Sequence, residues 1–296
     1  MRLYSIYVVC LLCLSGMYFT SCTASIDLKT NDSDPVVVIY GCLNEQMLHQ
    51  SIRISSSSPY FEEMQNQTIS DAVVTIQSSE NKFFELKESA GEKGVYQTVE
   101  LMAAKPGVTY RLKVEVDFDE DGVLEVYEAS TTMPDHYELD SINIRFQSIM
   151  GYKHYALDMY GLEGPGEDYY LCRIIVNDTI ERFKISQFIP MSDKGFDDEY
   201  MDGVVLTYIN DIEDYDEDDD DDYLYVTPGD KITLCTSRIG KGYYDFINQC
   251  QKEKNGENPF FGGPASNITT NISNGAVGYF TAFSTSMLDG VIPQEE

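Results

Sequence analysis

The chain has 296 residues, of which 50 are acidic and only 20 are lysine or arginine, so its formal net charge is −30. Such an excess of negative charge repels phosphate backbones and anionic lipid surfaces, which excludes nucleic acid as a partner and electrostatic attachment to such a membrane. Because 43% of the residues are hydrophobic, the composition is that of a folded protein rather than a disordered acidic tail, and the length suffices for two domains.

The amino terminus has the layout of an export signal. A single basic residue precedes a mostly apolar stretch, residues 3–19, and two small polar residues follow before Cys22. Polar residues interrupt the stretch, and it is shorter than the roughly 20 apolar residues of a spanning helix, so an uncleaved anchor is the weaker alternative. FTSC resembles a bacterial lipobox, although Phe19 stands where an aliphatic residue is usual. We therefore expect residues 1–21 to be removed, Cys22 to carry the lipid, and residues 22–35 to form a polar tether.

An immunoglobulin-like β domain is predicted for residues 36–134. Apolar and polar residues alternate along short segments such as SIRIS and RLKVEV, which is typical of strands with one buried face. Pro134 cannot donate to a strand ladder and should end the last strand. Seven strands, the number expected of an immunoglobulin-like sandwich, are predicted near residues 36–43, 50–57, 71–77, 82–87, 95–100, 108–117 and 123–132.

A second β-rich domain, a sandwich or barrel-like, is predicted for residues 138–296. One helix is expected near residues 241–254, because Tyr243, Phe246 and Ile247 recur at helical spacing and a glycine follows. The predicted fold class is therefore mainly β with one helix. Strands are predicted near residues 140–149, 154–160, 168–176, 180–189, 203–209, 223–227, 230–237 and 276–284.

A succession of short motifs gives the chain a resemblance to a known family. The motifs include VVVIYGCLN, KPGVTYRLKV, GPGEDYYLCRI, TPGDKITL and GYYDFINQCQ, in that order. Together with the lipobox they resemble a Bacteroidetes lipoprotein family, domain of unknown function 4249. The resemblance implies an outer-membrane lipoprotein that is associated with a TonB-dependent transporter and its substrate-binding lipoprotein. It supplies no catalytic residues.

The residues themselves give no support for an enzyme. There are three histidines and no HExxH, paired CxxC or GxSxG motif, so neither a zinc site nor a nucleophile is indicated. Acidic pairs are too numerous for two of them to be chosen as a glycosidase acid and base. We predict a non-enzymatic protein with no cofactor other than calcium as a candidate ion. Free buried thiols are favoured over disulfides for the four cysteines that follow the lipobox, Cys42, Cys172, Cys235 and Cys250.

The segment DFDEDGVLEVYE matches a calcium-loop signature. Its alternating acids, its glycine and its last glutamate fit D-x-D-x-D-G-x5-E through Asp117, Asp119, Asp121 and Glu128. However, the flanking segments alternate as strands, and Asp-Gly is a strong hairpin signal. In a hairpin, Glu128 would lie several residues along the second strand, too far away to complete a compact site. A hairpin is favoured, and a looser calcium site at the three aspartates is the alternative.

Two further features are ambiguous in sequence. Residues 211–222 contain ten acids, which favour a solvated loop; calcium capture or steering of cationic ligands is the alternative. DSI and DTI resemble a periplasmic O-glycosylation signal of Bacteroidetes, so Ser141 and Thr179 are candidate glycan carriers, with chance occurrence as the competing explanation.

The expected function rests on the predicted location of the protein and on its predicted partners. We predict an accessory component of a TonB-dependent nutrient uptake system, anchored in the outer membrane by lipid only and exposed at the cell surface. It would capture a peptide or glycan ligand or assist complex assembly, and the acidic surface favours a cationic peptide through steering. The alternatives are a structural or adhesive cell-surface protein and an unrecognised hydrolase.

Overall fold

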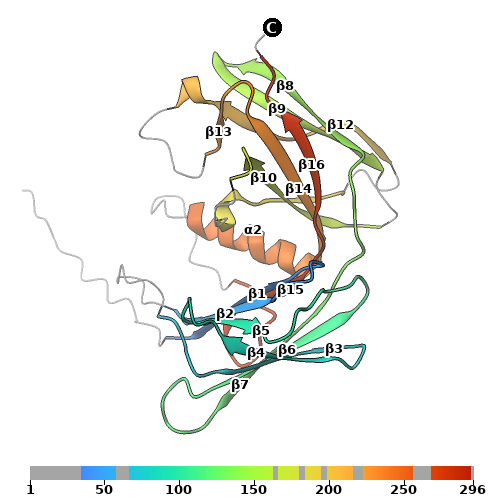
Figure 1. Cartoon of the computed structure of the whole chain (residues 1–296). Coiled ribbons are helices and arrows are strands. Elements are labelled where there is room, and N and C mark those ends of the chain that lie inside the picture. Colours follow the sequence, from blue (N-terminus) through green and yellow to red (C-terminus); the bar gives the residue numbers. More distant parts are fainter. Residues whose placement is uncertain are drawn as a thin grey trace, which may run out of the picture. The chain divides into compact units, whose positions relative to one another are not determined.

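The described part of the protein is mainly β, with sixteen strands, one α-helix and two short 3-10 helices (Figure 1). This confirms the predicted fold class. The strands are arranged in one eight-stranded sheet and two four-stranded sheets. The computed structural model describes residues 35–57, 67–162, 166–179, 184–194, 199–215, 223–255 and 268–294.

The first sheet contains all seven strands predicted for the first domain, with bounds that differ by only a few residues. Their side chains alternate between buried and exposed, as in β1, where every second residue is buried. Ile39, Ile54 and Val74 are completely buried in its core. The strands are β1 (Val37–Leu43), β2 (Ser51–Ser56), β3 (Val73–Ser78), β4 (Phe83–Glu88), β5 (Val95–Thr98), β6 (Thr109–Val116) and β7 (Glu125–Thr132).

This sheet is continuous and nearly closes on itself. Its order is β15-β1-β2-β5-β4-β3-β6-β7, with β15 (Val277–Ala282) at one edge and β7 at the other. The segment that precedes β15 bonds to β7: the Ser273 N–H donates to the Glu128 carbonyl at 2.9 Å, and the Asn271 amide donates to the Ser130 carbonyl at 3.3 Å. The two layers of the expected sandwich therefore belong to one curled sheet.

The second set of strands forms a sandwich. Sheet 2 has the order β11-β10-β14-β16, and sheet 3 has the order β13-β12-β9-β8. Leu157 and Met159 of sheet 3 share a core with Cys172 and Leu234 of sheet 2. The strands are β8 (Ser141–Ile149), β9 (Tyr152–Leu162), β10 (Tyr169–Val176), β11 (Ile189–Ser192), β12 (Tyr200–Asp211), β13 (Tyr225–Val226), β14 (Lys231–Ile239) and β16 (Ser286–Val291).

The strand predicted at 180–189 is wrong where the structure describes it. Residues 180–183 lie outside the described part, a 3-10 helix η2 (Ile185–Gln187) follows, and β11 begins only at Ile189. Ile185 and Phe188 pack against the aromatic cluster beside the helix instead of alternating across a sheet. Their packing explains why an apolar pattern did not become a strand.

The predicted helix is present as α2 (Lys241–Asn255). It buries Tyr243, Phe246 and Ile247 in a cluster that also contains Tyr279 and Phe283. Helical spacing of apolar residues therefore marked the buried face correctly.

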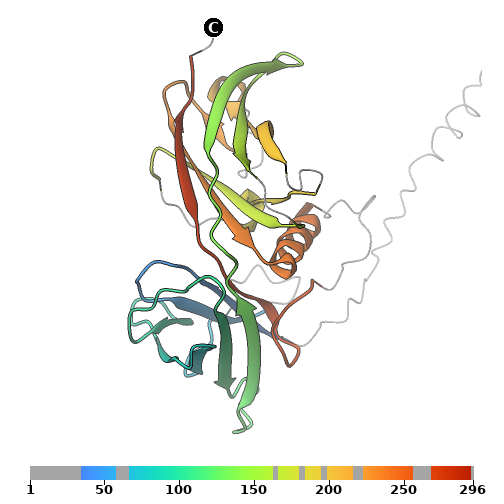
Figure 2. The same cartoon turned by 90° about the vertical axis from the view of Figure 1, so that its right-hand side faces the viewer.

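The carboxyl-terminal strands belong to two different sheets. After α2, β15 pairs in parallel with β1 of the first sheet, and the chain then continues into β16 of sheet 2 (Figure 2). Gly278 makes the close approach to β1 possible: its φ is +104°, and a Cβ there would lie 2.1 Å from the Ile39 carbonyl oxygen. The chain thus changes sheet near residues 134–138, but the later residues complete both parts of the fold.

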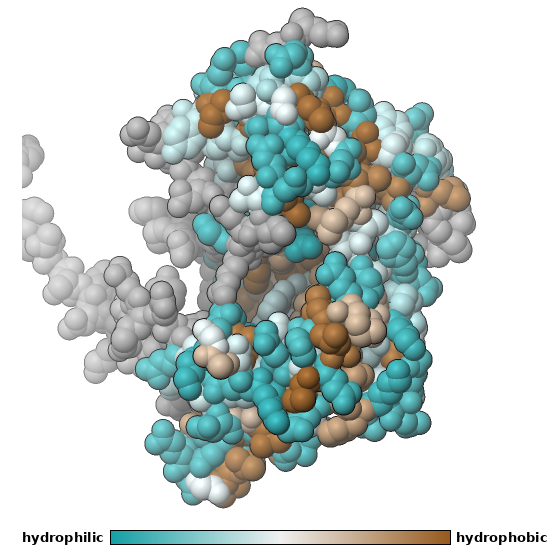
Figure 3. Space-filling view, in the orientation of Figure 1, coloured by the Kyte–Doolittle hydropathy of each residue, from teal (hydrophilic) through white to brown (hydrophobic). Residues whose placement is uncertain are grey.

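The surface is largely hydrophilic in the face shown in Figure 3, with hydrophobic side chains in separate patches. None of the helices in the described part is both long enough and apolar enough to cross a membrane.

Candidate functional site

A cavity of about 530 Å3 opens at the side of the sandwich formed by sheets 2 and 3. That volume lies within the roughly 300–1,000 Å3 of sites that hold small molecules or short polymer segments. Two runs of four consecutive residues line it, 174–177 at the end of β10 and 207–210 on β12. Gln187 of η2 and Tyr223 before β13 contribute further walls.

The lining residues that the structure describes are uncharged. Amide and hydroxyl groups come from Asn177, Asn210 and Thr207, and aliphatic surface comes from isoleucine, valine and leucine side chains. The Asn210 amide oxygen lies 3.1 Å from His154 Nδ1, which orients it, and the Asn210 N–H donates to the Leu224 carbonyl at 3.1 Å. Such a lining suits a ligand with neutral polar groups and an apolar face.

The acidic run begins at the end of β12, next to this cavity. Asp211 is buried, accepts a 2.7 Å hydrogen bond from the Tyr155 hydroxyl, and caps the 3-10 helix η3 (Ile212–Asp214) through the Glu213 N–H. Glu213 pairs with Lys153 at 2.8 Å. Asp211 therefore departs from the expected solvated loop, because it has a structural role, and residues 216–222 lie outside the described part.

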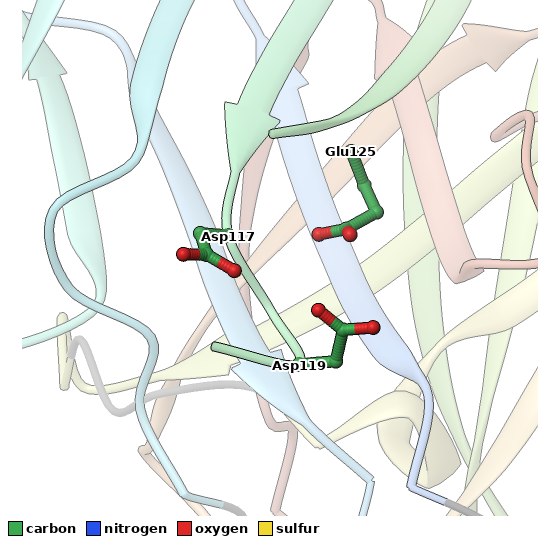
Figure 4. Close-up of side chains that lie close together, drawn as sticks. All are labelled: Asp117, Asp119 and Glu125. Atoms are coloured by element: carbon green, nitrogen blue, oxygen red, sulfur yellow. The ribbon is translucent and has the colours of Figure 1, made fainter. Parts of the chain in front are cut away.

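The calcium-loop signature lies at the tip of an antiparallel hairpin formed by β6 and β7. The carboxylates of Asp117, Asp119 and Glu125 have oxygens within 4.8 Å of one another, and Figure 4 shows the three side chains converging. Glu128 pairs instead with Lys113 along the strands. The structure thus brings two of the predicted residues together and replaces Glu128 by Glu125.

Hydrogen bonds within the tip explain this arrangement. Asp117 Oδ2 accepts from the Gly122 N–H at 3.0 Å, and Glu125 accepts from the Phe118 N–H at 2.8 Å. Asp121 turns away and accepts from the Val123 N–H at 2.8 Å. The register of the hairpin decides which carboxylates are neighbours, and the spacing of a calcium-loop signature does not. That register is the signal that could have identified Glu125. Calcium binding here stays a prediction.

The predicted modification sites differ in what the structure describes. Cys22 lies outside the described residues, together with the signal and nearly all of the tether. Ser141 is exposed at the start of β8, and Thr179 is exposed beside the cavity that it helps to line. Glycosylation of either residue stays a prediction.

All four described cysteines are free thiols, as the sequence favoured. Burial raises the pKa of Cys42 and of Cys172 to about 12, and that of Cys250 to about 11. Thiols with such pKa values stay protonated at neutral pH and are poor nucleophiles and metal ligands.

Comparison with known proteins identifies the family. Residues 23–289 match the family model described as "Domain of unknown function (DUF4249)". The chain belongs to the DUF4249 family. This confirms the family resemblance given by the sequence motifs, and the match extends from just after Cys22 into β16, so the DUF4249 model spans all three sheets.

Other comparisons add little to the DUF4249 assignment. No curated protein matches the chain. Among solved structures, the crystal structure of chicken CNTN1 FN1–FN3 domains is similar at 10% sequence identity and a TM-score of 0.26, covering 89% of this chain and 67% of that one. A TM-score of 0.26 is too low for the function of one protein to inform that of the other.

The cavity is the feature that sequence reasoning missed. Strands near residues 168–176 and 203–209 were predicted, but which strand edges remain unpaired is a property of the assembled sheets.

Proposed function

We propose that this DUF4249 protein is a non-enzymatic lipoprotein of the outer membrane that captures ligand for a TonB-dependent transporter. The observation that carries the proposal is the 530 Å3 cavity, whose described lining residues are all uncharged and combine aliphatic surface with amide and hydroxyl groups. Such a lining suits retention of a peptide or glycan without chemical conversion.

Attachment by lipid would place the cavity close to a transporter in the same membrane. If Cys22 carries the lipid, the residues between it and β1 span at most roughly 50 Å when fully extended. Confinement to one membrane raises the effective concentration of two proteins, so a modest interface would be well occupied. We place the protein at the cell surface, where ligand is first met.

Purification of a tagged chain from its native host in mild detergent tests the proposal. Mass spectrometry should recover a TonB-dependent barrel, with or without a substrate-binding lipoprotein, and intact-mass measurement should find a diacylated Cys22. A Cys22→Ala variant is the matched control, since it keeps the fold but loses the anchor and should lose the partner. Repeated recovery of the anchored chain without any transporter would contradict the proposal.

A structural or adhesive role is the second candidate, and one observation favours it. β8 pairs only with β9 in the described part of the chain, so its other edge is available to another strand. Self-association of the purified chain into oligomers or polymers that persist on dilution would support this alternative.

A further inference from the structure

Among the described residues, one edge of β10 has no strand partner where it meets the cavity. Odd-numbered residues of β10 bond to β14, and the Asn177 N–H, which donates to the Lys231 carbonyl at 2.9 Å, continues that series. Because the N–H and C=O groups of successive residues point to opposite sides of a strand, those of Ile174 and Val176 point away from β14. On that side β11 pairs only with Tyr169–Cys172.

Residues 184–188, the described segment before β11, turn toward α2 and do not pair with this edge of β10. The Gln251 amide of α2 donates to the carbonyls of Ile185 and Phe188, at 3.0 and 2.7 Å. In the described part of the chain, no strand pairs with the N–H and C=O of Ile174 or with the N–H of Val176. The Val176 carbonyl accepts from the Thr179 N–H at 3.0 Å.

Within the described residues, β12 on the facing wall also has an open edge. β13 pairs with β12 only at Asn210 and Asp211. Since the Asn210 N–H points toward β13, the backbone groups of Tyr208, two residues earlier, point to the same side, at a position before β13 begins. The cavity therefore touches consecutive residues of both strands because it meets their edges, not their faces.

We infer that the cavity binds an extended, cationic peptide segment, which adds to β10 as a strand in continuation of β11. The inference rests on the proposed ligand-capturing function and names its ligand class. The open groups of Ile174 and Val176 repeat every second residue, about 6.6 Å apart, and an extended peptide carries matching groups at the same spacing. A sugar chain has no such repeat of alternating donor and acceptor.

Side chains on the added strand would meet two different environments. One face would lie against aliphatic groups, since Ile174, Val176 and Leu224 pack on the edge of the sandwich core. The other face would meet the field of a chain that carries 50 acids against 20 lysines and arginines, and this excess of negative charge attracts positively charged side chains. A peptide that alternates apolar and basic residues is complementary to both.

The test uses the full chain, purified from its host in detergent. A library of acetylated, amidated hexapeptides that alternate apolar residues with lysine or threonine is equilibrated across a dialysis membrane, and retained peptides are identified by mass spectrometry. We expect enrichment of peptides with at least two lysines. The best peptide is then titrated beside maltohexaose, cellohexaose and a version with glutamate for lysine, none of which should bind comparably.

Two perturbations separate strand addition from other binding. N-methylation of the amides along one edge of the peptide should weaken binding at least tenfold, whereas methylation along the other edge should be tolerated, because only one edge pairs with β10. Val176→Pro removes an N–H that points into the cavity, and it should weaken binding at least tenfold relative to Val176→Ala, which keeps it. Circular dichroism and thermal unfolding confirm that both variants fold.

Each remaining result counts against the inference. An empty library screen, preferential binding of an oligosaccharide, equal tolerance of both methylated peptides, or equal affinity of the two Val176 variants would overturn it. These outcomes are independent of the proposed function, which stands or falls on recovery of the transporter.

Discussion

The hydroxyl pair Tyr40–Tyr243 connects the first strand to the helix and allows a sharp test of how the fold is held together. The two oxygens lie 2.5 Å apart, and both rings belong to the aromatic cluster around α2. Burial raises the pKa of Tyr40 to about 12 and raises that of Tyr243 further still. Both hydroxyls therefore stay protonated at neutral pH, so one can donate to the other.

Removing one hydroxyl leaves the other buried without its partner. A buried neutral hydroxyl without a hydrogen-bond partner costs about 1–3 kcal/mol of stability. We therefore expect Tyr40→Phe and Tyr243→Phe each to lower the free energy of unfolding by about 1.5 kcal/mol. The double variant leaves no orphaned hydroxyl. Its cost should therefore be only that of the lost hydrogen bond, about 1 kcal/mol, which lies below the cost of either single variant and gives a coupling of about 2 kcal/mol.

Urea unfolding at pH 7, followed by circular dichroism, measures these free energies by linear extrapolation. Tyr223→Phe is the matched control, since Tyr223 is 60% exposed and should change stability by less than about 0.5 kcal/mol. Neutral single variants, or a double variant with additive cost, would refute the reasoning. Because folding raises the pKa of Tyr40, its contribution to the free energy of unfolding is complete below about pH 10 and is lost between about pH 10 and 12. The double variant lacks this hydroxyl and should not show this loss.

Three other predictions follow from local geometry. Gly278→Ala should cost about 3 kcal/mol or more in thermal unfolding, because its Cβ would lie 2.1 Å from a carbonyl oxygen of β1; a change below about 1 kcal/mol would contradict this contact. The Gly94 N–H and a serine hydroxyl hold the pKa of Glu88 below its usual value, so wild type should be more stable than Glu88→Gln at pH 7, by a margin that shrinks as pH falls below about 4. Any calcium binding at the β6–β7 tip should be lost in Glu125→Gln and retained in Glu128→Gln by calorimetry; the opposite result would favour the sequence signature over the hairpin register.

Alternation of apolar residues predicted the strands well because most of them bury one face. β1 to β7 and α2 all lie where the periodicity placed them. β16 was missed because its exposed Met287 and Val291 give no clear alternation, and it is recognisable as a strand only by its pairing with β14. The alternation of apolar and polar residues thus predicts a strand where only one face of the strand is buried. It fails where a strand forms only because it pairs with a neighbour.

The partners of each strand were beyond the reach of sequence reasoning. β15 was predicted as a strand, but its parallel pairing with β1 joins Val277 to Val38 across most of the chain, and nothing local specifies it. The same limit applies to both candidate sites. Glu125 rather than Glu128 lies beside Asp117 because the strand register decides it. The cavity exists because β11 pairs with β10 only as far as Cys172, and β13 pairs with β12 only at its last two residues.

The position of β15 also predicts how ligand binding should be detected. The aromatic cluster includes Tyr40 of β1, Tyr169 of β10, Tyr243 of α2 and Tyr279 of β15, so the first sheet and the sandwich share buried surface. Loss of the sandwich would expose that surface in the first sheet, and the two should unfold together. A peptide bound beside β10 at 100 times its dissociation constant should therefore raise the free energy of unfolding by about 2.7 kcal/mol for both parts. Hydrogen exchange that reports this gain at β10 but none at β3 or β6 would show instead that the two parts open separately.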